Sequence, residues 1–253
     1  MIRFDHVSKT LGSRVVLDGV SFEIARGEAF VIVGPSGVGK SVTLKHMVRL
    51  LTPDRGRIFV GDSCVSSAEG AELEAIRDRF GYLFQDGALL EWMNLIENVS
   101  LPLREKTSMT ETAIHARAME VLAKVGLERD AMKFPSEISG GMRKRAGLAR
   151  AIVRNPEIVL YDEPTSGLDP VTARTIDSLI AELRRDMGVT SVIVTHDLHS
   201  ALSIGSRIAM LSGGRVVELS EPAAFLKSAR EEVQAFLWSQ FITRRGAWEQ
   251  EKT

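Results

Sequence analysis

The chain has 253 residues, of which 44% are hydrophobic and 26% are charged, and its formal net charge is −1. Such a composition is typical of a globular protein, either one large α/β domain or a core with a subdomain, and it gives no general attraction to nucleic acid. The longest apolar runs, such as Ala29–Val33, fall far short of the ~20 residues that cross a bilayer. Because the first residues lack the apolar core of a signal peptide and Cys64 is a lone cysteine, we expect a reducing, cytoplasmic setting.

The first 60 residues predict short strands separated by glycines. The expected strands are Ile2–Val7, Val15–Val16, Val20–Ile24, Ala29–Val33 and Arg57–Val60. We expect these strands to form an antiparallel sheet that joins the core of the fold.

From Glu72 to about Ala151 the apolar spacing turns helical. Its clearest helix is Thr110–Val125, which has a capping threonine at its start and Gly126 after its end. Strands and helices then alternate, which predicts a parallel sheet. The expected elements are strand Ile158–Tyr161, helix Val171–Met187, strand Ser191–Thr195, helix Leu198–Gly205, and strands Ile208–Leu211 and Val216–Glu218.

A glycine-rich segment between Ala29–Val33 and a helix-like stretch at Val42–Leu51 has the form of a phosphate-binding loop. Its backbone N–H groups would turn around a phosphate at a helix N-terminus, while Lys40 would reach the β- and γ-phosphates and Ser41 would bind Mg²⁺. Chance alone produces such a pattern in roughly 1% of chains of this length. The predicted nucleotide-binding residues are Gly34, Pro35, Ser36, Gly37, Val38, Gly39, Lys40, Ser41 and Val42.

Two carboxylates, Asp162 and Glu163, follow the apolar run Ile158–Tyr161. The carboxyl ends of parallel strands carry ligands, so Asp162 would hold Mg²⁺ and Glu163 would polarise the attacking water. A surface acidic pair is the alternative. His196 lies at the end of the next strand, and Gln85 follows the run Phe80–Phe84. Taken alone, each of these two residues is more often a solvated side chain than a catalytic one.

Ser139, Gly140 and Gly141 open a second predicted helix, Met142–Val153, whose N-terminus is also suited to phosphate. One chain needs only one such site, so a second copy paired head to tail would place these residues over the nucleotide of its partner. The alternative is an ordinary loop–helix junction whose basic residues, Arg143–Arg145, form an exposed charged face.

In this order, the phosphate loop, Gln85, Ser139-Gly-Gly, Asp162-Glu163, Ser166-Gly-Leu-Asp169 and His196 resemble the ATPase subunit of an ABC transporter over residues 1–220. The resemblance implies a P-loop NTPase core with a mostly parallel sheet, an N-terminal antiparallel subdomain, a helical subdomain at about 86–151 and a helical extension at 221–253. It also implies ATP and Mg²⁺ as the cofactors and a homodimer that sandwiches ATP.

The same resemblance assigns a role to each motif residue. Lys40, Gln85, Glu163 and His196 would act in hydrolysis, with Glu163 as the base, and Ser41, Gln85 and Asp162 would hold Mg²⁺. Signature-loop residues Ser139, Gly140 and Gly141, together with Asp169 of the D-loop, would bind the nucleotide of the partner.

Further residues resemble the Mla/Mce-type ATPases, which energise lipid traffic across the bacterial envelope: Phe84–Leu90, Glu97–Glu105 and the signature form Ser-Gly-Gly-Met-Arg-Lys-Arg. This likeness implies peripheral attachment to the cytoplasmic face of the inner membrane, an integral membrane permease and accessory lipid-binding or regulatory proteins, with no nucleic acid partner. A soluble ABC-type ATPase that acts as a clamp or regulator is the competing class.

Four features bear on partners and nucleotide. Ala88–Met93 is the expected permease contact, although its apolar residues would equally suit a subdomain core. Leu11 stands where the family usually presents an aromatic ring to adenine. Met142 stands where most members have glutamine, and the Mla-type proteins share this methionine. The C-terminal residues Val233, Phe236, Leu237 and Phe241 share a helical face that favours packing on the chain's own core.

Overall fold

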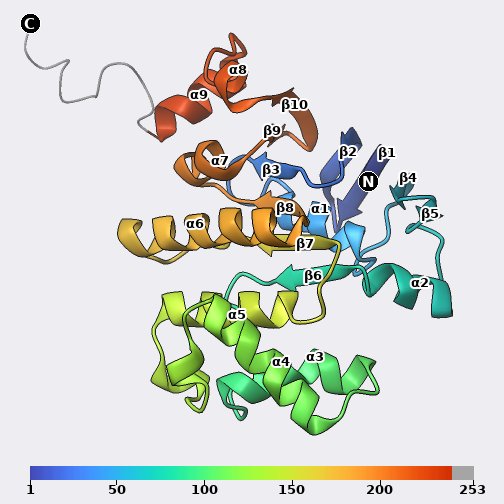
Figure 1. The fold of residues 1–253 in the computed structure, drawn as a ribbon. Coiled ribbons are helices and arrows are strands. Elements are labelled where there is room, and N and C mark those ends of the chain that lie inside the picture. Colours follow the sequence, from blue (N-terminus) through green and yellow to red (C-terminus); the bar gives the residue numbers. More distant parts are fainter. Residues whose placement is uncertain (241–253) are drawn as a thin grey trace, which may run out of the picture. The chain divides into compact units, whose positions relative to one another are not determined.

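Residues 1–240 are described by the computed structural model, in which they form two units (Figure 1). The first unit contains residues 1–68 together with the chain from Val194 onward, and the second is Glu69–Ile193. Within residues 1–240 no helix is both long and apolar enough to span a bilayer.

The first unit contains most of the strands. Its elements are β1 (Ile2–Leu11), β2 (Arg14–Ile24), β3 (Ala29–Val33), α1 (Lys40–Met47), β4 (Arg55–Val60), β5 (Ser63–Cys64), α7 (Leu198–Ile204), β9 (Arg207–Ser212), β10 (Arg215–Ser220), α8 (Pro222–Phe225) and α9 (Glu231–Ser239).

Two sets of strands organise this unit. An antiparallel sheet has the order β2-β1-β4-β5, and in a second set β9 lies between β10 and β3, antiparallel to β10 and parallel to β3. In β1, Phe4 faces the core and its ring stacks on Phe22 at 4.5 Å between centroids. The predicted N-terminal antiparallel sheet is confirmed, except that β3, also expected in it, pairs in parallel with β9.

The structure differs from the predictions in two places: a gap predicted between two strands, and the end of one helix. The separate strands expected at Val15–Val16 and Val20–Ile24 are one strand, β2, because Gly19 at φ +64° forms a bulge where the pairing steps from Val7↔Val20 to Lys9↔Leu17. Helix α1 ends at Met47 instead of Leu51. There Arg49 adopts φ +51°, and the N–H of Leu50 donates to the carbonyl of Lys45 (2.8 Å), which closes the helix end.

The second unit carries the helices of the insertion. Its elements are α2 (Gly70–Arg77), β6 (Phe80–Leu83), α3 (Leu95–Lys106), α4 (Glu111–Lys124), the 3₁₀ turns η1 (Glu128–Asp130) and η2 (Pro135–Glu137), α5 (Gly140–Ile152), β7 (Ile158–Asp162), α6 (Pro170–Met187) and β8 (Thr190–Val194). Strands β8, β7 and β6 follow one another in this order, and β6 runs parallel to β7.

Local sequence explains where the helices of the insertion begin. The helix predicted at Thr110–Val125 is α4, and Thr110 caps it by accepting from the N–H of Ala113 (3.3 Å). Helix α3 begins with a reciprocal capping box between Asn94 and Glu97, each of which accepts from the backbone N–H of the other. These two helices lie side by side with α5 in the lower half of Figure 1.

At the C-terminal end, α9 buries Val233, Phe236 and Leu237, in agreement with the predicted packing on the core. Phe241, which was expected on the same face, lies outside the described residues. The domain limits predicted at residues 86–151 and 221–253 stay a prediction.

Candidate functional site

The phosphate loop follows the fully buried strand β3, and two of its glycines are required by their surroundings. Gly34 has φ +146°, and a Cβ there would lie 2.4 Å from the backbone oxygen of Leu211. Gly39 has φ +112°, and its Cβ would lie 2.9 Å from the backbone oxygen of Val16. Only glycine fits both the backbone angle and the space, so β2 and β9 press directly against this loop.

Lys40, the first residue of α1, is turned back onto the loop. Its side chain is only 6% exposed, and Nζ donates to the carbonyls of Gly34 (2.9 Å) and Pro35 (3.2 Å). Pro35, Ser36 and Gly37 are exposed. An open curve of backbone, with a lysine amine inside it and a helix N-terminus behind it, fits the phosphates of a nucleotide.

Three other residues of the first unit bear on this loop. Nη1 of Arg14 lies 3.8 Å from the point that a Cβ on Gly37 would occupy, so a second cation faces the loop, and sequence reasoning missed it. Leu11 ends β1 with 42% of its surface exposed. His196 is exposed one residue after Thr195, whose N–H donates to the carbonyl of Ile32 in β3 (3.1 Å). His196 is thereby held next to the strand that leads into the loop.

In the second unit, β7 delivers the two predicted carboxylates. Asp162 is 6% exposed and accepts from the hydroxyl of Tyr82 (3.4 Å). Burial and the charge of Asp162 together raise the pKa of Tyr82 well above its ordinary value, so the phenol keeps its proton. Glu163 is half-buried and has φ +50°, an uncommon backbone conformation for a residue with a Cβ.

The backbone carbonyl of Glu163 is held by three donors. They are the N–H (3.2 Å) and the hydroxyl (2.9 Å) of Ser166 and Nζ of Lys144 (3.0 Å). Lys144 is 4% exposed, so the alternative interpretation of an exposed basic face on this helix is wrong at that position. Its spacing of three and four residues from Gly141 and Leu148, both buried, is the signal that places it on the inner face.

Gln85 is exposed, and the loop that carries it rests on α5. Lys144 donates to the carbonyl of Gln85, and the guanidinium of Arg150 donates to the carbonyls of Gly87 and Ala88 (2.7 Å each). A Cβ on Gly147 would lie 2.8 Å from the Cα of Gly87, so the loop and the helix are in direct contact. The sequence did not indicate this support.

Ser139 caps α5 by accepting from the N–H of Met142 (3.3 Å), and Ser139 and Gly140 are exposed. Gly141 is buried, and a Cβ there would lie 2.5 Å from Cγ2 of Thr172. Asp169 is exposed and caps α6. Bonds from the side chain and backbone of Thr172 hold the pKa of Asp169 below its ordinary value.

The predicted Mg²⁺ ligands are a hydroxyl, a carboxylate and a side-chain amide, on Ser41, Asp162 and Gln85. Such oxygen donors suit Mg²⁺, which keeps several waters and needs few protein ligands. Residues 1–240 contain no group of three His, Cys, Asp or Glu side chains that would hold a metal ion by itself.

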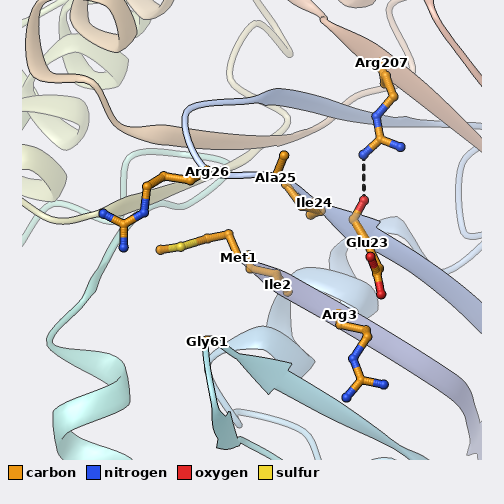
Figure 2. A pocket seen from close by; sticks show the side chains of 9 residues that line it. All are labelled: Met1, Ile2, Arg3, Glu23, Ile24, Ala25, Arg26, Gly61 and Arg207. Carbon is orange, nitrogen blue, oxygen red and sulfur yellow. Dashed lines mark hydrogen bonds between the residues drawn. The ribbon is translucent and has the colours of Figure 1, made fainter.

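A hollow of about 560 Å³ lies at one edge of the first unit (Figure 2). None of the predicted site residues lines it. Figure 2 shows that the guanidinium groups of Arg3, Arg26 and Arg207 lie apart, and Arg207 donates to the backbone carbonyl of Glu23 (2.7 Å). Since the cations do not converge, this hollow has no centre that would bind a phosphate.

The second unit contains an apolar groove of about 610 Å³. Its walls include Tyr82, Phe84 and Ala88 on either side of Gln85, and Leu101 and Pro102 of α3. Arg150, Arg154 and Glu105 also line it. The groove and the Gln85 loop therefore share residues.

The sequence and the fold match known proteins. A family profile described as ABC transporter matches residues 17–166. The "Probable ribonucleotide transport ATP-binding protein mkl" of Mycobacterium tuberculosis (strain ATCC 25618 / H37Rv) is 44% identical over 93% of this chain, which spans 66% of that protein. The "Intermembrane phospholipid transport system ATP-binding protein MlaF" of Escherichia coli (strain K12) is 38% identical over 91% of this chain and 86% of its own length.

Among solved structures, the dimeric structure of MJ0796, described as a bacterial ABC transporter cassette, has a TM-score of 0.81 at 36% identity and covers 88% of this chain and 99% of that one. A dimeric post-hydrolysis state of the same cassette, bound to ADP and Pi, has a TM-score of 0.80 at 34% identity and the same coverage. These matches share the α/β fold with a mostly parallel sheet and an antiparallel sheet.

Proposed function

The chain belongs to the ABC transporter family as an ATPase cassette, and from that premise we propose that it pairs with a second copy around two ATP molecules and drives phospholipid transport through a separate membrane permease. The observation that carries this proposal is the pair of helix N-termini suited to phosphate: one behind the loop that encloses Lys40, the other exposed at Ser139 and Gly140.

Within one chain, the phosphate loop and Lys40 would bind the nucleotide phosphates, and Ser41, Asp162 and Gln85 would hold Mg²⁺. Bound Mg-ATP supplies the phosphoanhydride bond that is cleaved. Glu163 would accept a proton from the attacking water, and His196 would face the terminal phosphate. Little covalent chemistry is needed from the protein, so the placement of these groups decides the rate.

Pairing follows from the exposed N-terminus of α5. Ser139 and Gly140 face solvent in the single chain, and the 13-residue helix behind them directs its positive end outward. A second copy would bring its own nucleotide to this end, and Asp169 would lie in the same interface. The dimeric state of the MJ0796 cassette supports this arrangement.

The groove of the second unit is our proposed docking site for the permease. Its lining combines apolar residues such as Leu101 with charged ones such as Arg150 and Arg154, and Phe84 and Ala88 of its lining lie on either side of Gln85 in the sequence. A permease segment seated here would push on the Gln85 loop directly. Of the segment Ala88–Met93, Ala88 lines the groove, and Trp92 has 73% of its surface exposed, which leaves both available to a partner.

Phospholipid is our proposed cargo because the motif residues resemble the Mla/Mce type and because MlaF, by its name, belongs to an intermembrane phospholipid transport system. Ribonucleotide is a second candidate, suggested by the name of the 44% identical mkl protein. Either cargo requires a permease, which places the chain peripherally at the cytoplasmic face of the inner membrane, with room for accessory lipid-binding or regulatory proteins. A soluble clamp that moves no cargo is the alternative.

The pairing is tested with Glu163→Gln, which should slow hydrolysis and trap the ATP-bound state. We expect light scattering to show a dimer with Mg-ATP and a monomer without nucleotide. Adding Ser139→Arg should abolish that dimer, whereas Ser108→Arg, at an exposed serine between α3 and α4, should not. A dimer that survives Ser139→Arg would contradict the head-to-tail arrangement.

The transport role is tested by purifying the tagged protein from its own membranes in mild detergent. We expect an integral membrane protein to co-purify, to be lost with Leu101→Asp in the groove, and to make ATP hydrolysis respond to added phospholipid. If ATP hydrolysis responded to ribonucleotides and not to phospholipid, ribonucleotide would replace phospholipid as the proposed cargo. Co-purification of ribosomes or nucleic acid, without a membrane protein, would favour the clamp.

A further inference from the structure

Lys144 is a buried cation bonded to the backbone of Gln85 and Glu163, two of the proposed hydrolytic residues, and the family motifs give it no role here. Its ammonium donates to the carbonyl of Gln85, to the carbonyl of Glu163 (3.0 Å) and to the hydroxyl of Ser166 (3.2 Å). An ammonium has three N–H donors, so these three acceptors satisfy it completely. One side chain thus joins three segments to helix α5: the loop that carries Gln85, the backbone of Glu163, and Ser166.

Burying the charged ammonium of Lys144 costs free energy, which indicates that this lysine has a role beyond packing. Burial of an ammonium disfavours its charged form and lowers the pKa of Lys144, while the nearby charges of Asp86, Glu163 and Asp162 act in the opposite direction. None of the three hydrogen-bond acceptors carries a formal charge. An apolar residue of similar volume would avoid this cost, so packing alone does not account for a lysine here.

We propose that Lys144 is a positioning residue for Glu163: by holding the Gln85 and Glu163 carbonyls on α5, it sets the placement of the carboxylate that activates water. The inference rests on the proposed role of Glu163 as the base. It assigns to Lys144 no contact with the nucleotide.

The backbone of Glu163 explains why such a hold is needed. At φ +50° a residue with a Cβ is strained and keeps that conformation only if its surroundings enforce it. Ser166 and Lys144 supply the bonds to its carbonyl. Without Lys144 the carbonyl of Glu163 loses one of its three donors and keeps the two bonds from Ser166, so we expect the backbone of Glu163, and with it the carboxylate, to be less firmly placed.

Helix α5, which carries Lys144, begins directly after Ser139, the proposed contact with the nucleotide of the partner. Ser139 caps α5, and Lys144 follows five residues later, about 7.5 Å along the helix axis. A shift of α5 when Ser139 meets the partner's nucleotide would therefore reach Glu163 through Lys144. Arg150 lies on the same helix, and its guanidinium donates to the carbonyls of Gly87 and Ala88, so it also supports the loop that carries Gln85.

The experiment compares Lys144→Met with Lys144→Arg, which keeps the donors, and with Arg117→Met. Arg117 is a matched control because it also donates to a backbone carbonyl after α5, that of Val153 (3.1 Å), and its side-chain partners Glu120 and Asn155 are not site residues. For Lys144→Met we expect kcat to fall roughly 10- to 100-fold, with KM for ATP changing less than about 3-fold. Lys144→Arg should recover part of the loss, and Arg117→Met should keep the wild-type kcat.

A readout without nucleotide isolates the positioning role. In hydrogen exchange of the nucleotide-free protein, amides of residues 85–88 and 163–167 should exchange faster in Lys144→Met than in the wild type, and Arg117→Met should leave these two segments unchanged. A general loss of protection across α5 and β7 would instead mark a structural role and overturn the proposal.

The decisive test is a double-mutant cycle with Glu163→Gln. If Lys144 acts through Glu163, Lys144→Met should lower the residual kcat of Glu163→Gln by less than about 2-fold. An equal fold-loss in both backgrounds would refute the link. If Glu163→Gln alone keeps the wild-type kcat, the proposal that Glu163 is the catalytic base is refuted. Amide hydrogen exchange at residues 163–167 then still decides whether Lys144 holds that segment in place.

Discussion

Replacement of Gly34 by alanine is the sharpest test of the phosphate loop's geometry. The new Cβ would lie 2.4 Å from the backbone oxygen of Leu211 in β9 and 3.1 Å from Cγ1 of Val38. The first neighbour is main chain within a parallel strand pair, so it has little freedom to move away. The matched control is Gly27→Ala, where φ is +72° but nothing lies within 4 Å of the new Cβ.

The two substitutions separate backbone strain from steric overlap. At Gly27 only the positive φ opposes alanine, which costs about 1–2 kcal/mol of the free energy of unfolding. At Gly34, φ +146° is essentially glycine-only and the overlap displaces packed backbone, so we expect about 2–5 kcal/mol. Since β9 and the loop must move apart, the backbone N–H groups of the loop are displaced as well, and we expect nucleotide affinity to fall at least 10-fold, or about 1.4 kcal/mol.

Urea unfolding followed by circular dichroism measures the stability of both variants, and calorimetric titration with Mg-ATP measures affinity. We expect Gly27→Ala to be modestly less stable with wild-type affinity, and Gly34→Ala to lose both. The reasoning would be refuted if the two variants were equally stable, because the contact with Leu211 would then not constrain the loop.

Two further predictions concern the contact with adenine and the buried His46. Leu11→Tyr supplies an aromatic side chain on which adenine can stack, so we expect ATP binding, measured by calorimetry, to tighten about 5-fold. Unchanged affinity would show that residue 11 does not contact adenine. Burial lowers the pKa of His46 below its ordinary 6.5, and its Nδ1 lies 2.7 Å from the carbonyl of Val42. Because the unfolded chain then binds more protons, stability should be fully present above pH 6.5 and be lost as pH falls from there toward the folded-state pKa. Urea midpoints between about pH 5 and 7 should show that slope in the wild type and a weaker one in His46→Gln, and identical slopes would count against it.

The motifs whose geometry is local were predictable from sequence. Gly34 and Gly39 are fixed by backbone angles that glycine alone adopts, and the strand before them is a continuous apolar run. Thr110 and Gly126 bound helix α4 for equally local reasons, a cap and a residue at φ +66°. The order of motifs along the chain supplied the family.

Contacts between segments distant in sequence were not predictable in this way. Lys144 reads as part of a basic, solvated helix face, yet 59 residues separate it from Gln85, whose carbonyl it binds. The groove likewise takes its walls from β6, α3 and α5, and nothing in any one of these segments marks it as a wall.

Sequence alone determined which atoms are available: a glycine loop able to turn its N–H groups inward, two carboxylates after a buried strand, and helix ends suited to phosphate. These depend on backbone angles and periodicity within a few residues, which the chain specifies locally. Tertiary structure decided which of them are connected, because a buried ammonium is stable only where distant carbonyls converge, and that convergence exists only after β6, α5 and β7 have packed.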